Sequence, residues 1–229
     1  MKAYAVTEDQ ENTGAIIFAD HAIVARKRGA DEYNDGELRG ITCCRAPWAD
    51  EYAGKPVPAS LMIDHGWHFE CGHCGARIDT DYLDDEDLPL DGVIGTQHSV
   101  VYCSAVCQAS DKLEEAVRAH HCRRAIKALS EFVHKRFPGV MIRADGNNQP
   151  HAYAAQRRGA WQVEQAVVSF DFPGMNIAPA QCRFDRCSGS SQNLVGPIRP
   201  HFTCCGGDVE AFEAWAASPE SREKSEKAT

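Results

Sequence analysis

The chain has 229 residues and is acidic, with 33 Asp and Glu against 24 Lys and Arg and a formal net charge of −9. This balance excludes a protein that wraps nucleic acid broadly, because neutralising phosphates requires surplus basic side chains. The sequence also contains no apolar run near the roughly 18 residues that a bilayer-spanning helix requires. The 43% of apolar residues can bury a core, and the length favours modules that share one.

Residues 1–66 are predicted to form a small strand-helix-strand module. Asp20 is expected to cap a helix over residues 21–33. The side chains of this helix that face the sheet would be Ile23, Val24 and Ala30. Three β-prone runs would form the strands: residues 3–7, 15–19 and 38–46.

The chain contains 11 cysteines, and their spacing is the most informative feature of the rest of the sequence. The N-terminal residues MKAYAVTEDQ lack the apolar stretch of a signal peptide, so we expect a cytoplasmic protein. In a reducing cytoplasm, cysteine pairs hold metal more often than they form disulfides. The spacing of the cysteines is therefore interpreted as a pattern of metal ligands.

Residues 67–137 carry such a pattern, followed by a long helix. Cys71 and Cys74 are separated by two residues, and Cys103 and Cys107 by three. A CxxC turn can direct two thiolates at one ion, and residues four apart share a face of a helix. The positive end of the helix dipole also favours thiolates there. The pattern predicts one zinc ion held by all four thiolates; four unrelated buried cysteines are the alternative.

This arrangement resembles the treble-clef zinc finger, in which a knuckle and a β-hairpin lead to a helix whose first turn supplies the last two ligands. The end YCSAVC (102–107) is similar to the Tyr/Phe-Cys-Ser-x-x-Cys end of some of these fingers. The resemblance covers residues 67 to about 130 and departs from the family in a long acidic insertion.

A wider resemblance covers about the first 110 residues. The stretches AIIFADHAIVARKRGADE (15–32), CRAPWADEY (44–52) and GWHFECGHCG (66–75) resemble uncharacterised zinc-knuckle proteins of bacteriophages and prophages. That resemblance implies a phage origin and a bacterial host cytoplasm as the setting. It implies no activity and no catalytic residues.

Two segments accompany the cysteine pairs. Residues 79–91 contain seven acidic residues and no basic one, which predicts a solvated loop. After Cys103 the apolar spacing predicts a helix over residues 104–136. Its apolar stripe would consist of Leu113, Val117, Cys122, Ile126, Leu129 and Val133.

Residues 138–217 are predicted to be an antiparallel β region. A hairpin is expected from residues 140–144 and 151–155, followed by a strand over residues 161–172. The remaining segments are expected to be a loop over 178–206, a helix capped by Asp208 over 209–217 and a disordered tail over 218–229. The fold class is therefore α+β, with a zinc-stabilised centre between two flanking regions.

A second metal site is a further hypothesis. Its ligands would be Cys182, Cys187, Cys204 and either His201 or Cys205. The spacing matches no familiar zinc finger, so ordinary buried or free thiols are the competing interpretation.

The expected function follows from the closed set of four thiolates. Such a site leaves no open position for water, which favours a structural ion over a catalytic one. With an acidic surface and an implied phage origin, we expect a non-enzymatic protein that binds and modulates or inhibits a host macromolecule. The expected partner is a host protein, such as a defence or nucleic-acid-processing factor.

Two other hypotheses remain. Residues 116–136 contain six basic residues, three histidines and one acid, so the helix could instead contact nucleic acid through Arg118, Arg123, Arg124 and Lys127. A solvated helix face, or a partner for the acidic segment 79–91, is the simpler interpretation of these charges. An HNH-like nuclease is disfavoured, because Asp64 and His65 precede the knuckle and His98 fits a hairpin surface.

Overall fold

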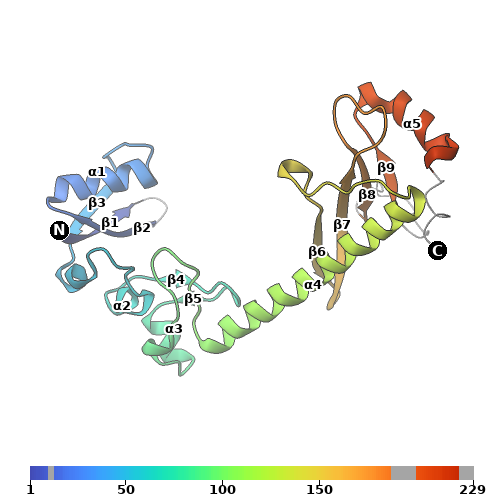
Figure 1. Cartoon of the computed structure of the whole chain (residues 1–229). Coiled ribbons are helices and arrows are strands. Elements are labelled where there is room, and N and C mark those ends of the chain that lie inside the picture. The colour runs from blue at the N-terminus through green and yellow to red at the C-terminus, as the bar shows by residue number, and fades with distance from the viewer. Residues whose placement is uncertain (10–12, 187–199, 222–229) are drawn as a thin grey trace. The chain divides into compact units, whose positions relative to one another are not determined.

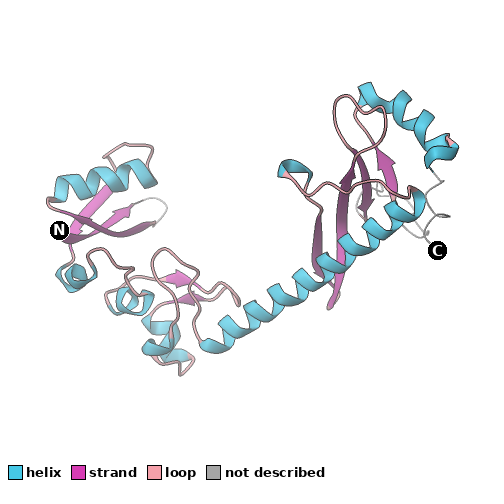
Figure 2. Ribbon diagram, in the orientation of Figure 1, coloured by secondary structure: helices cyan, strands magenta, loops and turns pink. Residues whose placement is uncertain are grey.

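The computed structural model describes residues 1–9, 13–186 and 200–221 (Figure 1). The chain divides into two compact units, Met1–Leu113 and Glu114–Thr229. Helix α4 (Ala105–Arg136) begins in the first unit and ends in the second. Both units contain helices and strands (Figure 2), so the predicted α+β class is confirmed.

The first unit contains a three-stranded antiparallel sheet with the strand order β2-β1-β3 and a two-stranded ribbon, β4-β5. Short 3-10 helices lie at Pro47–Tyr52 and Leu90–Gly92. The other elements are β1 (Lys2–Glu8), β2 (Gly14–Ala19), α1 (Ala22–Tyr33), β3 (Ile41–Arg45), α2 (Ala59–Asp64), β4 (Phe69–Glu70), β5 (Arg77–Ile78) and α3 (Thr80–Asp85).

Side chains of β1 alternate between the two faces of the three-stranded sheet, as the pleat requires. Tyr4 and Val6 pack with Ala25 and Ala30 of α1. Ala3 belongs to a second cluster, which includes buried side chains of α2 and of the 3-10 helix before it. The sheet is therefore covered on both faces, and β1 lies at the centre of the module.

Helix α1 differs from its prediction in its cap and in its buried face. Its N-cap is His21, whose side chain makes no capping hydrogen bond, so the expected cap at Asp20 is wrong. Of the three side chains expected to face the sheet, two are exposed and only Ala30 is buried. The helix lies close to the sheet: a Cβ added to Gly29 would be only 2.3 Å from Val6 Cγ1. Small residues therefore form the contact face.

The second unit combines a four-stranded antiparallel sheet, in the order β6-β7-β8-β9, with α5 and the C-terminal part of α4. Short 3-10 helices lie at Gly146–Asn148, Gly206–Asp208 and Pro219–Ser221. The strands and the last helix are β6 (His151–Arg157), β7 (Ala160–Phe170), β8 (Ala180–Asp185), β9 (His201–Thr203) and α5 (Val209–Ala217).

The core of the second unit lies on one face of this sheet. Phe137, which directly follows α4, is 1% exposed and contacts the rings of Phe170, Phe202, Phe212 and Trp215. The buried members of the core come from α4, the sheet and α5: Leu129, Val133, Phe137, Ala166, Val168, Phe170, Phe172, Ala180, Cys182, Phe212 and Trp215. Helices α4 and α5 therefore meet over the same sheet face.

The bounds of the long helix were predicted almost to the residue, but only part of its predicted apolar stripe is buried. Leu129 and Val133 are buried in the core of the second unit. Leu113, at the start of the expected stripe, is 65% exposed. Apolar spacing thus located the helix, while burial of the stripe is confined to its C-terminal part.

Three predictions for the C-terminal region were wrong. Strand β6 pairs with β7 through the two-residue turn Arg158-Gly159, whose φ angles of 51° and 78° fit the tight turns of β-hairpins. The expected strand 140–144 contributes only an isolated bridge from Ile142 to Phe170. Residues 178–206, expected to be a loop, include β8 and β9.

The C-terminal segment was also predicted to be disordered from residue 218 onward. Ser221 is instead buried, and its hydroxyl donates to the carbonyl oxygens of Ala216 at 3.2 Å and Ser218 at 2.8 Å. This anchors the turn after α5. Residues 222–229 of the predicted tail lie outside the described residues.

Asp208 precedes α5, but its carboxylate stabilises a different segment. The side chain makes no capping hydrogen bond to the helix. It is fully buried and accepts N–H groups from Asn176 at 3.0 Å, Ile177 at 2.9 Å and Ala178 at 3.2 Å. Burial alone would raise the pKa of Asp208, but these three N–H groups outweigh it and hold the pKa below its ordinary value.

This shift predicts an acid-sensitive second unit. Because the folded pKa lies below the unfolded value of about 3.9, the contribution of Asp208 is present above that pH and is lost as the pH falls through the folded pKa. We expect Asp208→Asn to lower the melting temperature at pH 7 and to flatten its decline below about pH 4. Melting curves at pH 7, 5, 4 and 3 measure both effects. Glu210→Gln, at an exposed acid of α5, is the matched control; equal behaviour of the two variants would contradict the assignment.

Candidate metal centre

The first cysteine pair lies on the tight turn between β4 and β5. Cys71 N donates to Ala76 O at 2.8 Å, and Gly75 N donates to Cys71 O at 3.0 Å, which closes the turn. Gly75 has a φ of +71°, a conformation that residues with a Cβ rarely adopt. Gly72 is required for packing instead, because a Cβ there would lie 2.2 Å from Val100 Cγ1.

The second pair lies where the chain enters α4. Cys103 precedes the helix, which begins at Ala105, so only Cys107 is in its first turn. Ser104 caps this end, since its Oγ accepts the N–H of Cys107 at 3.3 Å. The approach is held to the first pair by backbone hydrogen bonding, with Gly72 N donating to Val101 O at 2.8 Å.

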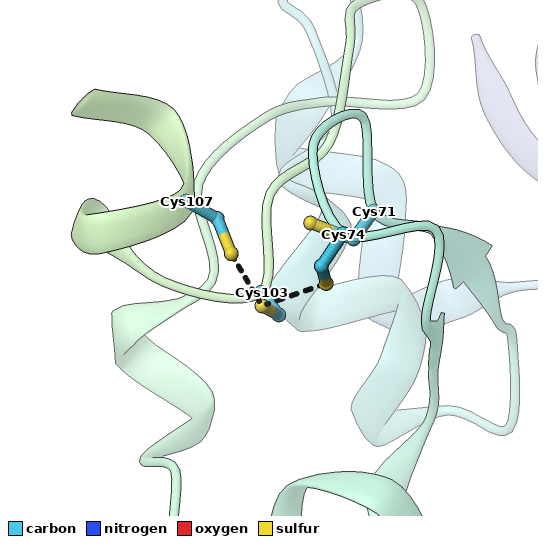
Figure 3. A group of neighbouring side chains, drawn as sticks. All are labelled: Cys71, Cys74, Cys103 and Cys107. Carbon is cyan, nitrogen blue, oxygen red and sulfur yellow. Dashed lines mark hydrogen bonds between the residues drawn. The ribbon is translucent and has the colours of Figure 1, made fainter. Parts of the chain in front are cut away.

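These two segments bring four thiols together (Figure 3). The Sγ atoms of Cys71, Cys74, Cys103 and Cys107 all lie within 4.8 Å of one another. Cys103 Sγ is 3.4 Å from Cys107 Sγ and 3.9 Å from Cys74 Sγ. Four thiolates placed about 2.3 Å from one tetrahedral zinc ion would be about 3.8 Å apart. The arrangement therefore fits a metal such as zinc.

The pKa values of the two buried thiols are shifted in opposite directions. Burial raises the pKa of Cys71, but the backbone N–H groups of Cys103, Cys74 and His73 outweigh it and bring the pKa down to about 6. Burial and the neighbouring sulfurs raise the pKa of Cys103 to about 12. Four negative charges this close repel one another, and a bound divalent cation removes that conflict.

A small apolar core supports the thiol cluster. Cys71 and Cys103 are 2% and 4% exposed and pack with Ile78, Leu83 and Val101, among others. Leu83 belongs to α3, which lies within the acidic segment 79–91. That segment was predicted to be a solvated loop, and the prediction was wrong for its first half.

The sequence contains a capping pattern that predicts the start of α3, but only the number of acidic residues in segment 79–91 was considered. Asp79 is its N-cap, and its carboxylate accepts the N–H of Tyr82 at 3.0 Å. The pattern of an Asp three residues before an apolar pair is a recognisable helix start. Tyr82 was missed as part of the site: burial, together with the charges of Cys103 and Cys74, raises its pKa to about 12.

The second predicted metal site does not form from the residues that are described. Cys182 is 0% exposed in the core of the second unit, and burial raises its pKa to about 12. It pairs with Phe202 across β8 and β9, whereas His201 pairs with Arg183. Since adjacent residues of a strand point to opposite faces, Cys182 and His201 face away from each other. Cys204 is only partly buried beside the core, and Cys187 lies outside the described residues.

The candidate nucleic-acid contacts are all on α4. Arg118, Arg123, Arg124 and Lys127 are exposed. At about 100° of rotation per residue, Arg118 lies about 120–180° around the helix from the other three. The helix therefore does not bring the four predicted contacts to one surface.

The residues considered for a nuclease have separate neighbours. The His65 ring stacks on Trp48 with 4.2 Å between centroids. His98 lies 2.9 Å from the amide nitrogen of Gln97, whose side chain also bonds the backbone of Ile16 in β2. Both histidines are exposed, and each contacts a different neighbour.

None of the helices described is both long and apolar enough to cross a bilayer. The thiol cluster is also the one group of three or more His, Cys, Asp or Glu residues, within the described ranges, arranged to hold a metal ion.

The chain was further compared with known proteins, and no family model, curated protein or solved structure matches it.

Proposed function

We propose that Cys71, Cys74, Cys103 and Cys107 hold one zinc ion and that the surrounding residues form a treble-clef finger. The observation that carries this proposal is the convergence of four thiols within 4.8 Å from two distant segments. A knuckle on the β4–β5 turn and a second pair at the entry to a helix are the parts that this finger requires. When bound, the ion would cross-link these segments.

The same site supports a non-enzymatic role. Four protein thiolates fill a tetrahedral zinc ion, so no position remains for water or substrate. The ion would then organise a scaffold, and the protein would act by binding another macromolecule.

The proposed partner is a host protein with a basic surface. Helix α3 and the turn after it present five exposed acids next to the metal site: Asp81, Asp84, Asp85, Glu86 and Asp87. A basic surface is typical of proteins that process nucleic acid. Together with the resemblance to phage proteins, this supports a cytoplasmic inhibitor or modulator in a bacterial host.

Cobalt(II) substitution tests the closed site. We expect one cobalt per chain with the absorption of a tetrahedral tetrathiolate centre, unchanged when azide is added, because no coordination position is open. A spectrum that shifts with azide would show an open position and would contradict a purely structural ion.

The partner is tested by affinity capture from bacterial lysate with a matched variant. The wild-type chain should retain a basic protein. The variant Asp84→Asn/Asp85→Asn should lose it, because two of the exposed negative charges are removed. The fold should be kept, since neither side chain supports it by a contact within the described residues. Asp31→Asn/Glu32→Asn, at exposed acids of α1, is the control. Recovery of the same proteins by all three chains would reject the acidic surface as the binding site.

A further inference from the structure

One face of α4 in the second unit carries almost only positive or titratable side chains. This basic face consists of His120, Arg123, Arg124, Lys127, His134 and Lys135, all of them exposed. At 3.6 residues per turn they fall within about 120° of the helix circumference. The opposite side of the helix holds Leu129 and Val133 in the core.

The packing of α4 fixes this face toward solvent. Because Leu129 and Val133 are 4% and 0% exposed, the helix cannot rotate about its axis without losing the core. Arg136 is already engaged, since its Nη2 donates to Ala216 O at 3.1 Å and its guanidinium lies 4.6 Å from the centre of the Phe137 ring. The basic face is thus presented by a rigid element, while the neighbouring arginine serves the fold.

The charges of the basic face are available to a partner. Glu131 is the one acid within the arc of this face, 3.9 Å from Lys127, and the two side chains are largely exposed, at 68% and 79%. An exposed pair at this spacing contributes about 0.3–0.5 kcal/mol and is readily exchanged. Among the described residues, no other ion pair involves the basic face.

We propose that the basic face of α4 binds the phosphate backbone of nucleic acid. From His120 to Lys135 the helix rises about 22 Å at 1.5 Å per residue, which matches about six phosphates along one strand of a duplex at about 3.4 Å each. Two arginines at its centre can each donate two parallel hydrogen bonds to a phosphate. The residues of this surface are different from those of the metal site and from the acidic residues of α3.

The chemistry of the surface also limits what it recognises. Contacts to phosphate carry no sequence information, so binding should be similar for unrelated sequences. The chain as a whole is acidic, with a formal net charge of −9, which confines binding to this face and keeps it weak at high salt.

The test is fluorescence anisotropy of a labelled 20-base-pair duplex DNA with the full-length, metal-loaded chain. Neutralising three to four phosphates predicts a slope of log affinity against log salt of about −2.7 to −3.6, and hence a loss of about 40- to 150-fold between 50 and 200 mM salt. Arg123→Glu/Arg124→Glu should weaken binding at 50 mM salt by at least about tenfold and reduce the slope by about 2. Lys27→Glu/Lys55→Glu, at exposed bases in the first unit, makes the same change in net charge and should bind like the wild type.

Other results would overturn the proposal. The first is the absence of an anisotropy change when the wild type is added at 50 mM salt. The second is equal weakening of binding by both double variants, which would indicate an effect of net charge alone. Labelled polyglutamate is the second probe. If it binds the wild type as tightly as DNA with the same loss in Arg123→Glu/Arg124→Glu, the surface fits an acidic protein and not a nucleic acid. Circular dichroism of the variants confirms that α4 is intact.

Discussion

Removing the metal from the four-cysteine site is expected to unfold the segment from the β4–β5 turn to the start of α4. The two strands of this ribbon have two residues each, and α3 has six, so neither is stable alone. Binding of a structural zinc ion supplies about 10–16 kcal/mol of apparent free energy. That is as large as the total stability of a typical domain, about 5–15 kcal/mol, so the loss of the ion should be decisive for this segment.

Two variants and a control separate the ion from the other thiols. Cys71→Ser and Cys107→Ser each remove one ligand and should lower the zinc content, measured by elemental mass spectrometry, from one per chain to near zero. Cys44→Ser changes an exposed thiol of β3 in the same unit and should keep its zinc.

Hydrogen exchange locates the consequence. The N–H of Tyr102, bonded to Ile94 O at 2.8 Å, should lose protection in both ligand variants and after chelation of the wild type. Amides of β7 in the second unit should stay protected, because their core contains no residue of the site. A metal-free chain with full protection at Tyr102 would refute the role given to the ion.

Truncation of Phe137 should have the largest effect on the second unit. Its ring lies 4.6 Å from Trp215, 5.1 Å from Phe202 and 5.7 Å from Phe170, measured between ring centroids. Phe137→Ala removes the side chain that joins α4, the sheet and α5, and leaves a cavity among large rings. We expect a loss of about 3–5 kcal/mol in the free energy of unfolding.

The control for Phe137 lies one and a half turns earlier. Phe132 stacks on Phe202 at 5.9 Å but is 39% exposed, so Phe132→Ala should cost much less, about 1 kcal/mol. Denaturant unfolding followed by circular dichroism compares the two variants. Similar midpoints for Phe137→Ala and Phe132→Ala would mean that the aromatic cluster is not the centre of this core.

The candidate metal site was readable because its signal is local. Cys71 and Cys74 share one turn, and Cys103 and Cys107 share one helix entry, so spacing alone identified each pair. The pairing of the two was a prediction that the distances between the four sulfurs support. Tyr82 and α3 were missed, because a count of acidic residues hid the capping pattern that starts at Asp79.

The described members of the second predicted metal site do not form one, for the opposite reason. The positions of Cys182 and His201 depend on the pairing of β8 and β9, and spacing in the sequence carries no information on that register. Once Cys182 pairs with Phe202, the alternation of strand side chains sends it into the core and His201 to the other face.

The sequence by itself determined the α+β class, the long helix, predicted over residues 104–136 and observed over Ala105–Arg136, and the two cysteine pairs, because helical periodicity and ligand spacing are properties of neighbouring residues. Only the tertiary structure decided which part of that helix is buried, which strands pair, and that Arg118 is separated from Arg123, Arg124 and Lys127. Those outcomes depend on contacts between distant segments, where burial against a particular sheet face overrides local preference.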